Sequence, residues 1–368
     1  MQKLYSVALY VSLFCAALFV GMLIAGMTAE TSYPVIIGLL SLALGIRQYP
    51  QYASLSFTVL ILTSVSMAMY HPEWLVKWGD YELKNLITPL MQLIMFGVGS
   101  VMTAEDFVGV AKMPKGVIVG LLAQFSIMPI VGYTLAKVFN FPPEIAAGVV
   151  LIGCVPSGLA SNVMCYIANA NVALSVTITS LATLLSPILT PALLKLLAGE
   201  FVEINFLDRM FDILKVAIMP IAIGVLLNRF AKTLVDKLKN ILPLISMGGI
   251  VFILGIITAM GRDKLLVIGL VLIFSSFLHN LFGYLLGYGM ARLSKLDEKS
   301  CRAVAIEVGL QNGGLASALA LQMGKVSTMG LAPAIFGPLM NITGSMLANW
   351  WRNRPVEEDE QEESVPQV

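Results

Sequence analysis

One carboxylate stands out among the side chains that could bind an ion or a substrate. Glu307 lies deep in an apolar segment, where a charged side chain costs about 2.5–3.5 kcal/mol to insert into a membrane. Such a residue normally faces a cavity and has polar partners. Gln311 and Asn312 follow it, and their amide oxygens would contribute to a site made of oxygen atoms. That composition favours a hard cation such as Na⁺ over a soft metal, while a structural acid and a proton-binding acid stay open as alternatives.

Glu307 belongs to one of two apolar segments that are interrupted by glycine, proline and polar residues. The first interruption, from Gly153 to Asn162, reads Gly-Cys-Val-Pro-Ser-Gly-Leu-Ala-Ser-Asn, and the second, from Glu307 to Ser317, reads Glu-Val-Gly-Leu-Gln-Asn-Gly-Gly-Leu-Ala-Ser. Backbone groups freed by such breaks need partners inside a membrane, so these segments must line protein or water. If the two breaks cross, Ser161 and Asn162 become further neighbours of Glu307.

The composition is that of an integral membrane protein. Of the 368 residues, 58% are hydrophobic and 12% are charged, about half the charged fraction of a soluble domain. The formal net charge of +1 provides no general basic field, so we expect no nucleic-acid partner. The four cysteines are scattered, and we expect them to be small packing residues rather than metal ligands or disulfides.

Apolar runs with polar punctuation predict twelve helical spans and an all-α polytopic membrane protein. The predicted spans are 4–27, 33–46, 53–71, 86–103, 115–138, 143–169, 172–198, 210–228, 240–260, 264–292, 300–324 and 327–350, of which 143–169 and 300–324 are interrupted. The first run is longer than the roughly 7–15-residue apolar core of a signal peptide, so we expect a retained helix there.

The two interrupted spans occupy matching positions in the chain. Counted from Ala53, each is the fourth of five spans, and because five is odd the second half enters the membrane in the opposite sense. Paired broken helices in inverted halves point to the binding site of a transporter. The N-termini of the half-helices offer unpaired N–H groups and a positive dipole end, which would hold an anionic substrate without a buried Lys or Arg.

The distribution of basic residues predicts the orientation. With the N-terminus inside, fourteen Lys and Arg residues fall in cytoplasmic segments and eight in external ones, which follows the positive-inside rule and places both termini in the cytoplasm. We expect an extra N-terminal transmembrane hairpin over 1–50, inverted repeats over 51–200 and 201–352, and a disordered acidic cytoplasmic tail over 353–368.

Four stretches resemble the bile acid:sodium symporter (BASS) family, in particular its bacterial members. They are Ala-Gln-Phe-Ser-Ile-Met-Pro at 123–129, Ala-Ser-Asn-Val-Met at 160–164, Asn-Val-Ala-Leu-Ser-Val-Thr-Ile-Thr-Ser at 171–180 and Ile-Glu-Val-Gly-Leu-Gln-Asn at 306–312. The resemblance extends from about Ala53 to Trp351. It implies ten helices in two inverted five-helix repeats, arranged as a panel and a core, with two broken helices that cross in the core.

The resemblance also implies the residues of the site. A first sodium site would comprise Ser161, Asn162, Ser175, Thr179 and Glu307, and a second would comprise Gln124, Glu307, Val308, Leu310 and Gln311, with Val308 and Leu310 acting through their carbonyls. For the substrate we expect Leu159, Ser157, Asn312, Gly313 and Asn341. Leu159 stands where bacterial relatives often carry a threonine, so the acid that is bound stays open.

We therefore expect a sodium-coupled symporter for a small or amphipathic organic anion, such as a bile-acid-like, pantoate-like or 2-oxo acid. It would work by alternating access in the inner membrane of a bacterium, among lipids, with sodium as co-substrate and no other cofactor; the sequence does not predict an oligomeric state. The alternative is a proton-coupled or sodium-independent carboxylate carrier, in which Glu307 takes up a proton.

Other classes of function have weaker support. Ser157-Gly158 resembles part of an intramembrane serine protease motif, but Val155 stands where the motif needs glycine. His279 is the only histidine inside a predicted span, because His71 is the end residue of 53–71. No metalloprotease, phosphate-loop or cofactor motif is present, so we do not expect an enzyme. A channel is disfavoured because broken-helix pairs are typical of alternating access.

Overall fold

The computed structural model describes residues 2–27, 30–49, 55–102, 112–238, 241–354 and 356. Helices form in every predicted span. In chain order they are α1 (Gln2–Ile24), α2 (Ser32–Gly45), α3 (Leu55–Tyr70), α5 (Ile87–Val101), α7 (Pro114–Val138), α8 (Pro143–Cys154), α9 (Ala160–Ile167), α10 (Val172–Ala198), α11 (Phe206–Ile213), α12 (Met219–Phe230), α14 (Leu242–Met260), α15 (Arg262–Leu293), α16 (Glu298–Gly309), α17 (Gly313–Gln322) and α18 (Leu331–Arg352). Residues 53, 54, 103 and 240 of the predicted spans, and 355 and 357–368 of the predicted tail, lie outside the described residues.

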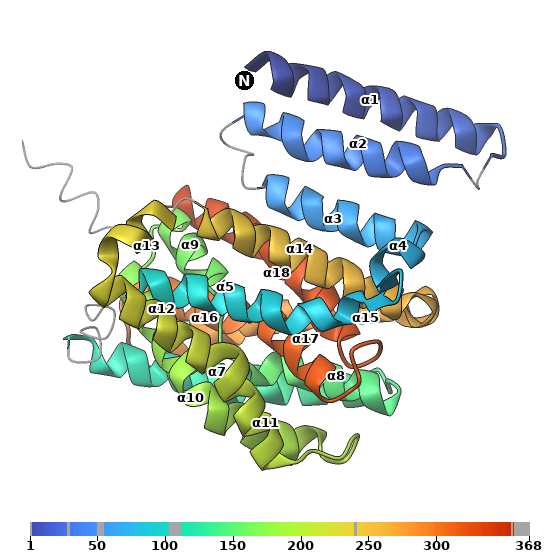
Figure 1. Ribbon diagram of the computed structural model, residues 1–368. Helices are drawn as coiled ribbons and strands as arrows, with labels where there is room; N and C mark the ends of the chain where they lie inside the picture. The colour runs from blue at the N-terminus through green and yellow to red at the C-terminus, as the bar shows by residue number, and fades with distance from the viewer. Residues whose placement is uncertain are drawn as a thin grey trace, which may run out of the picture.

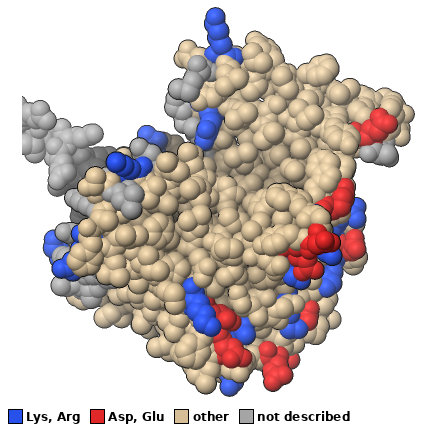
Figure 2. Space-filling view, in the orientation of Figure 1, with Lys and Arg blue, Asp and Glu red and all other residues tan. Residues whose placement is uncertain are grey.

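The helices identify an all-α polytopic membrane protein. Among the described residues, six helices are long and apolar enough to cross a membrane. Figure 2 shows a broad face with few charged side chains, which gather toward its edges. The outermost helix, α1, buries little but Ala8 and Cys15, so the surrounding lipid, and not the protein, must cover most of its apolar side chains.

The two predicted interruptions are real breaks in the helices. Val155 and Leu310 have extended backbones where α8 and α16 end. Pro156 explains the first, since the residue before a proline is pushed out of the helical region. Ser157 and Gln311 pair across the breaks in an antiparallel bridge, and the Asn312 N–H donates to the Pro156 carbonyl at 2.9 Å. Each break therefore supplies partners for backbone groups of the other.

The remaining helices form two neighbouring groups (Figure 1). In the first, α3, α5, α12 and α14 pack on one another. In the second, α7, α8, α10, α15, α16 and α18 surround the breaks. The N-terminal hairpin packs on the first group: α1 contacts α2, and α2 contacts α3. The Ser56 hydroxyl fixes the α2–α3 contact by donating to the Ala43 carbonyl at 2.6 Å.

Short elements that the spans did not predict occur at the ends of the helices. They are α4 (Glu73–Val76), β1 (Lys77–Trp78), β2 (Tyr81–Glu82), α13 (Lys232–Leu238), the 3-10 turns Ile46–Gln48 and Leu83–Leu86, and a π-helical turn at Leu214–Ile218. The strands pair through a Gly79-Asp80 turn in which Gly79 has a φ of 59°, a conformation that favours glycine. The π-turn splits the predicted span 210–228 just before Pro220, which has no N–H to continue the α-helical pattern.

Close backbone packing joins α5 to α12 in the first group. A Cβ atom added at Gly99 would lie 2.1 Å from the Ile221 carbonyl oxygen, and one added at Gly224 would lie 2.5 Å from the Phe96 carbonyl oxygen. Small residues at such contacts let membrane helices approach closely. Because the obstacle is backbone, no side-chain rotation can relieve it.

Gly99→Ala is therefore expected to destabilise the protein by about 1–3 kcal/mol, the usual range for overpacking. Gly248→Ala on α14 is the matched control, since a Cβ there meets no atom within 4 Å and alanine is the better helix former by about 1 kcal/mol. Thermal unfolding in detergent measures both. Equal melting temperatures for the two variants would contradict the close packing of α5 on α12.

Candidate functional site

The centre of the site is the carboxylate of Glu307, which is fully buried near the C-terminal end of α16. Three hydroxyl groups donate to it. Ser157 donates to Oε2 at 2.5 Å and Thr179 to the same oxygen at 2.8 Å, while Ser175 donates to Oε1 at 2.5 Å. These donors come from the first break and from α10, so the carboxylate joins three segments that are far apart in the sequence.

The oxygen atoms of α9 extend this network. Asn162 Oδ1 lies 2.8 Å from the Ser175 hydroxyl and 3.3 Å from the Thr179 hydroxyl. Ser161 Oγ lies 3.3 Å from Thr179 Oγ1. The five residues predicted for the first sodium site therefore lie in one hydrogen-bonded network. We call this network, together with Ser157, the carboxylate cluster.

The carboxylate cluster has more acceptor positions than protons. The Ser175 hydroxyl lies within reach of both Asn162 Oδ1 and Glu307 Oε1, but a hydroxyl has only one proton to donate. Thr179 is shared in the same way. A cluster of neutral oxygens around one negative charge matches the preference of a hard cation for oxygen ligands.

The second predicted set is only partly brought together. Gln124 Nε2 donates to Gln311 Oε1 at 2.8 Å and to the Val155 carbonyl at 3.0 Å. Gln311 Nε2 donates to the Val308 carbonyl at 2.6 Å. The Glu307 carboxylate accepts hydrogen bonds from the hydroxyls of Ser157, Ser175 and Thr179 and not from these two amides. A cation bound there would have to displace amide N–H groups from the oxygens that were expected to hold it.

A cavity of about 380 Å³ adjoins the carboxylate cluster. All five residues predicted for the substrate line it, namely Ser157, Leu159, Asn312, Gly313 and Asn341. Thr179 and Gln311 also reach its wall. The structure thus places the predicted substrate residues together and beside the predicted cation ligands.

The lining of this cavity is uncharged. Among the described residues, no Lys, Arg, Asp or Glu lines it. Part of the lining consists of polar groups of the breaks, and another part consists of apolar residues of α3, α5 and α14, including Phe57, Met91, Met95, Ile250 and Leu254. A ligand with a polar head and an apolar body would match both parts.

Two helix N-termini open onto the cavity. The α17 helix begins at Gly313, where Asn312 Oδ1 caps the Leu315 N–H at 3.0 Å. The α9 helix begins at Ala160 behind Leu159, which provides no side-chain cap. Both N-termini lie among the residues that line the cavity. Their positive dipole ends and N–H groups favour an anion.

Several contacts at the site were not predicted. Ser157 was expected at the substrate, yet its hydroxyl also donates to Glu307. Thr179 was expected as a cation ligand, yet it also lines the cavity. The Gln311 N–H donates to the sulfur of Met340 at 3.3 Å, a contact for which the sequence has no recognisable signal. The position of Ser157 directly after Pro156 in the break was the one available signal for its role.

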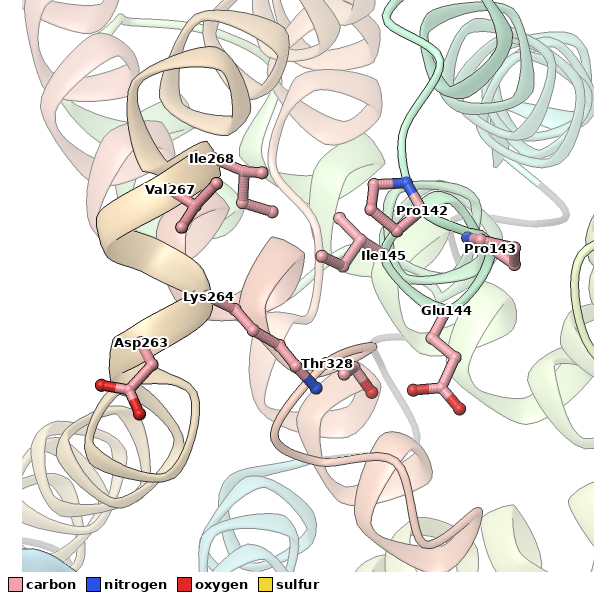
Figure 3. Close-up of a pocket in the computed structure, with 9 residues that line it drawn as sticks. All are labelled: Pro142, Pro143, Glu144, Ile145, Asp263, Lys264, Val267, Ile268 and Thr328. Atoms are coloured by element: carbon pink, nitrogen blue, oxygen red, sulfur yellow. The ribbon is translucent and has the colours of Figure 1, made fainter.

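A second cavity, of about 520 Å³, shares no lining residue with the first. It lies where α8 and α15 begin, beside the connection from α17 to α18 (Figure 3). Glu144 forms an ion pair with Lys325 there, and the Lys264 side chain extends toward Thr328. It contains none of the predicted site residues, so we assign the candidate site to the cavity beside Glu307.

Comparisons with known proteins agree with this chemistry. A sequence model described as the sodium bile acid symporter family matches residues 88–268. An uncharacterized sodium-dependent transporter of Bacillus subtilis is 39% identical over 310 residues, which are 84% of this chain and 94% of that protein. The probable sodium/metabolite cotransporter BASS1 of Arabidopsis thaliana chloroplasts is 34% identical and covers 73% of this chain and 68% of its own length.

A human relative has a named cargo. The human ileal sodium/bile acid cotransporter is 32% identical over 250 residues, which are 64% of this chain and 69% of that protein. The names of these relatives describe transporters and cotransporters, not enzymes. Ser157 and His279 were the two residues considered for a protease site. In this chain the Ser157 hydroxyl donates to Glu307, and His279 Nε2 lies 2.9 Å from the Met128 carbonyl oxygen.

Proposed function

The chain belongs to the sodium bile acid symporter family, and from that premise we propose that it is a secondary transporter in which sodium drives the movement of an organic anion by alternating access. One observation carries the proposal. A buried carboxylate with hydroxyl and amide oxygens around it adjoins an uncharged cavity onto which two helix N-termini open. The first arrangement suits a hard cation and the second suits an anion.

The proposed sodium ligands are those of the two predicted sites. The first comprises Ser161, Asn162, Ser175, Thr179 and Glu307, to which the geometry adds Ser157. The second comprises Gln124, Glu307, Val308, Leu310 and Gln311. Gln124 donates a hydrogen bond to Gln311, and a cation at the second site would have to break it. The first site can therefore bind a cation with a smaller rearrangement of side chains.

The proposed architecture has inverted repeats over 51–200 and 201–352, with a panel of α3, α5, α11–α12 and α14 and a core of α7 to α10 and α15 to α18. The N-terminal hairpin, 1–50, would extend the panel, because α2 packs on α3. With both termini in the cytoplasm, Val101 at the end of α5 and Leu242 at the start of α14 lie toward the cytoplasm. Both line the cavity, so this conformation would face inward.

The proposed cargo is a small or amphipathic organic anion. Its carboxylate would bind at the N-termini of α9 and α17, near Asn312 and Gly313, and its apolar part would contact the wall formed by α3, α5 and α14. Leu159 and Asn341 line the same cavity and would select among acids. Bile-acid-like, pantoate-like and 2-oxo acids all fit this description.

Uptake by proteoliposomes tests the proposal. Labelled taurocholate, pantoate and a 2-oxo acid are supplied with an inward gradient of either sodium or potassium. We expect uptake of at least one acid with sodium and not with potassium. Uptake that depends on pH but is equal with both cations would instead select the alternative, a carrier in which Glu307 binds a proton.

The charge of the cargo can be tested at Ile250, which lines the cavity from α14. Two negative charges ~8 Å apart repel each other by about 2 kcal/mol at an effective dielectric constant of ~20. A glutamate at this position would therefore weaken the binding of an anion roughly 30-fold. Ile250→Glu is therefore expected to raise the KM for the acid strongly, and Ile250→Gln, of similar size and uncharged, to raise it much less. Equal KM values for the two variants would contradict an anionic cargo in this cavity.

A further inference from the structure

Two hydroxyl-bearing residues belong to both the carboxylate cluster and the wall of the cavity. They are Ser157 and Thr179, since both donate to Glu307 Oε2 and both line the cavity. Ser175 differs, because it donates to the same carboxylate at the same 2.5 Å as Ser157 but is not among the residues that line the cavity.

Of the two shared hydroxyls, that of Ser157 depends more on Glu307 as its hydrogen-bond partner. The Ser157 backbone pairs with Gln311 across the breaks, so the residue is held by both interrupted segments. Its side chain has Glu307 as its partner in the cluster. Thr179 also lies 3.3 Å from Asn162 Oδ1 and from Ser161 Oγ, so its hydroxyl keeps partners within the cluster when it turns.

A serine hydroxyl has one proton and two lone pairs. In this structure the Ser157 proton is directed at Glu307, so toward the cavity Ser157 presents no donor. A cation at the carboxylate binds hydroxyl oxygens through their lone pairs, and the proton of such a hydroxyl then points away from the cation. Because Ser157 also lines the cavity, a proton that no longer points at Glu307 can be donated to a ligand there.

We propose that the Ser157 hydroxyl couples the two substrates: a sodium ion at Glu307 turns its proton into the cavity, where it donates to the anion. This inference rests on the proposed function and adds a specific group to it. When sodium binds, the cavity gains the Ser157 hydroxyl as a hydrogen-bond donor. Sodium therefore raises the affinity of the cavity for the anion. By linkage, the anion raises the affinity for sodium by the same factor.

The test measures a coupling factor, the dissociation constant of a labelled acid in potassium divided by that in saturating sodium. The probe is whichever of taurocholate, pantoate and a 2-oxo acid shows the fastest sodium-driven uptake. For the wild type we expect a factor of about 5–150. Ser157→Ala is expected to lower it by about tenfold, the loss of one hydrogen bond to a charged group.

Two controls separate coupling from folding and from sodium binding. Ser175→Ala removes an equivalent hydrogen bond to Glu307, so it is expected to raise the sodium concentration that is needed while keeping the coupling factor at saturating sodium. Ser157→Thr and Ser157→Val have the same shape and differ in the hydroxyl, so threonine is expected to retain the coupling factor and valine to lose it.

The outcomes are distinguishable. An unchanged coupling factor in Ser157→Ala or Ser157→Val, or an equal loss in Ser175→Ala, would overturn the role of Ser157 and leave sodium-coupled transport in place. Absence of sodium-dependent binding of every acid by the wild type would overturn the proposed function, and this inference with it.

Discussion

Replacing Glu307 by glutamine is expected to abolish sodium-driven uptake, with a loss of about a hundredfold or more. Changing a residue that only orients a metal ligand typically lowers metal affinity or activity about 10–100-fold. Glu307 would supply the negative charge itself, so its loss is expected to have a larger effect. Glutamine preserves the size of the side chain but removes its charge. Its NH2 group donates where a carboxylate oxygen accepted, so at least one hydroxyl of the cluster must turn to accept from it. The initial rate of uptake into proteoliposomes under a sodium gradient measures the effect.

The matched control for this charge is Glu203→Gln. Glu203 is exposed in the connection between α10 and α11, so the substitution removes one carboxylate without touching the cavity, and uptake is expected to stay at the wild-type rate. Full sodium-dependent uptake by Glu307→Gln would show that the cation binds elsewhere.

Replacing Arg302 by methionine is expected to cause a large loss of stability. The Arg302 side chain is 4% exposed and pairs with Glu298 at 2.9 Å. Its guanidinium also donates to the carbonyls of Trp351 at 3.2 Å and Arg354 at 2.9 Å, and to that of Ala168 at 3.4 Å. It thus ties the start of α16 to the ends of α9 and α18.

Arg302→Met would leave buried carbonyls without their donor, which costs about 1–3 kcal/mol for each buried group left unsatisfied. It would also remove the buried member of the pair with Glu298, whose side chain is 25% exposed. Thermal unfolding in detergent should show a melting temperature well below that of the wild type. Arg292→Met is the control, because Arg292 is exposed at the end of α15 and its loss is expected to matter little. Similar melting temperatures for both variants would contradict the role of Arg302.

The helices could be predicted well because apolar length and end signals agree in this sequence. The predicted span 172–198 coincides with α10, whose first turn is capped by Asn171 Oδ1 at 3.0 Å from the Leu174 N–H. Pro156 located the first break by its effect on Val155. The β1–β2 hairpin was missed, since its strands are two residues long and have too few residues for an alternating pattern.

The site could be predicted in part. Ser175 and Thr179 are four residues apart on a helix, which places both hydroxyls on one face, and both reach Glu307. The partners of Ser157 could not be read from spacing, because they depend on how two distant breaks meet. Gln124 and Gln311 were expected to offer oxygens to a cation, but an amide also carries N–H donors, and the two side chains pair with each other.

Sodium titration of the purified protein without any acid tests directly whether the carboxylate cluster around Glu307 binds sodium. The heat of binding would be measured for the wild type and for Glu307→Gln, with sodium and with potassium at equal ionic strength. We expect saturable binding of sodium to the wild type, little binding of potassium, and no saturable binding to Glu307→Gln. Equal binding of sodium by the two proteins would contradict it.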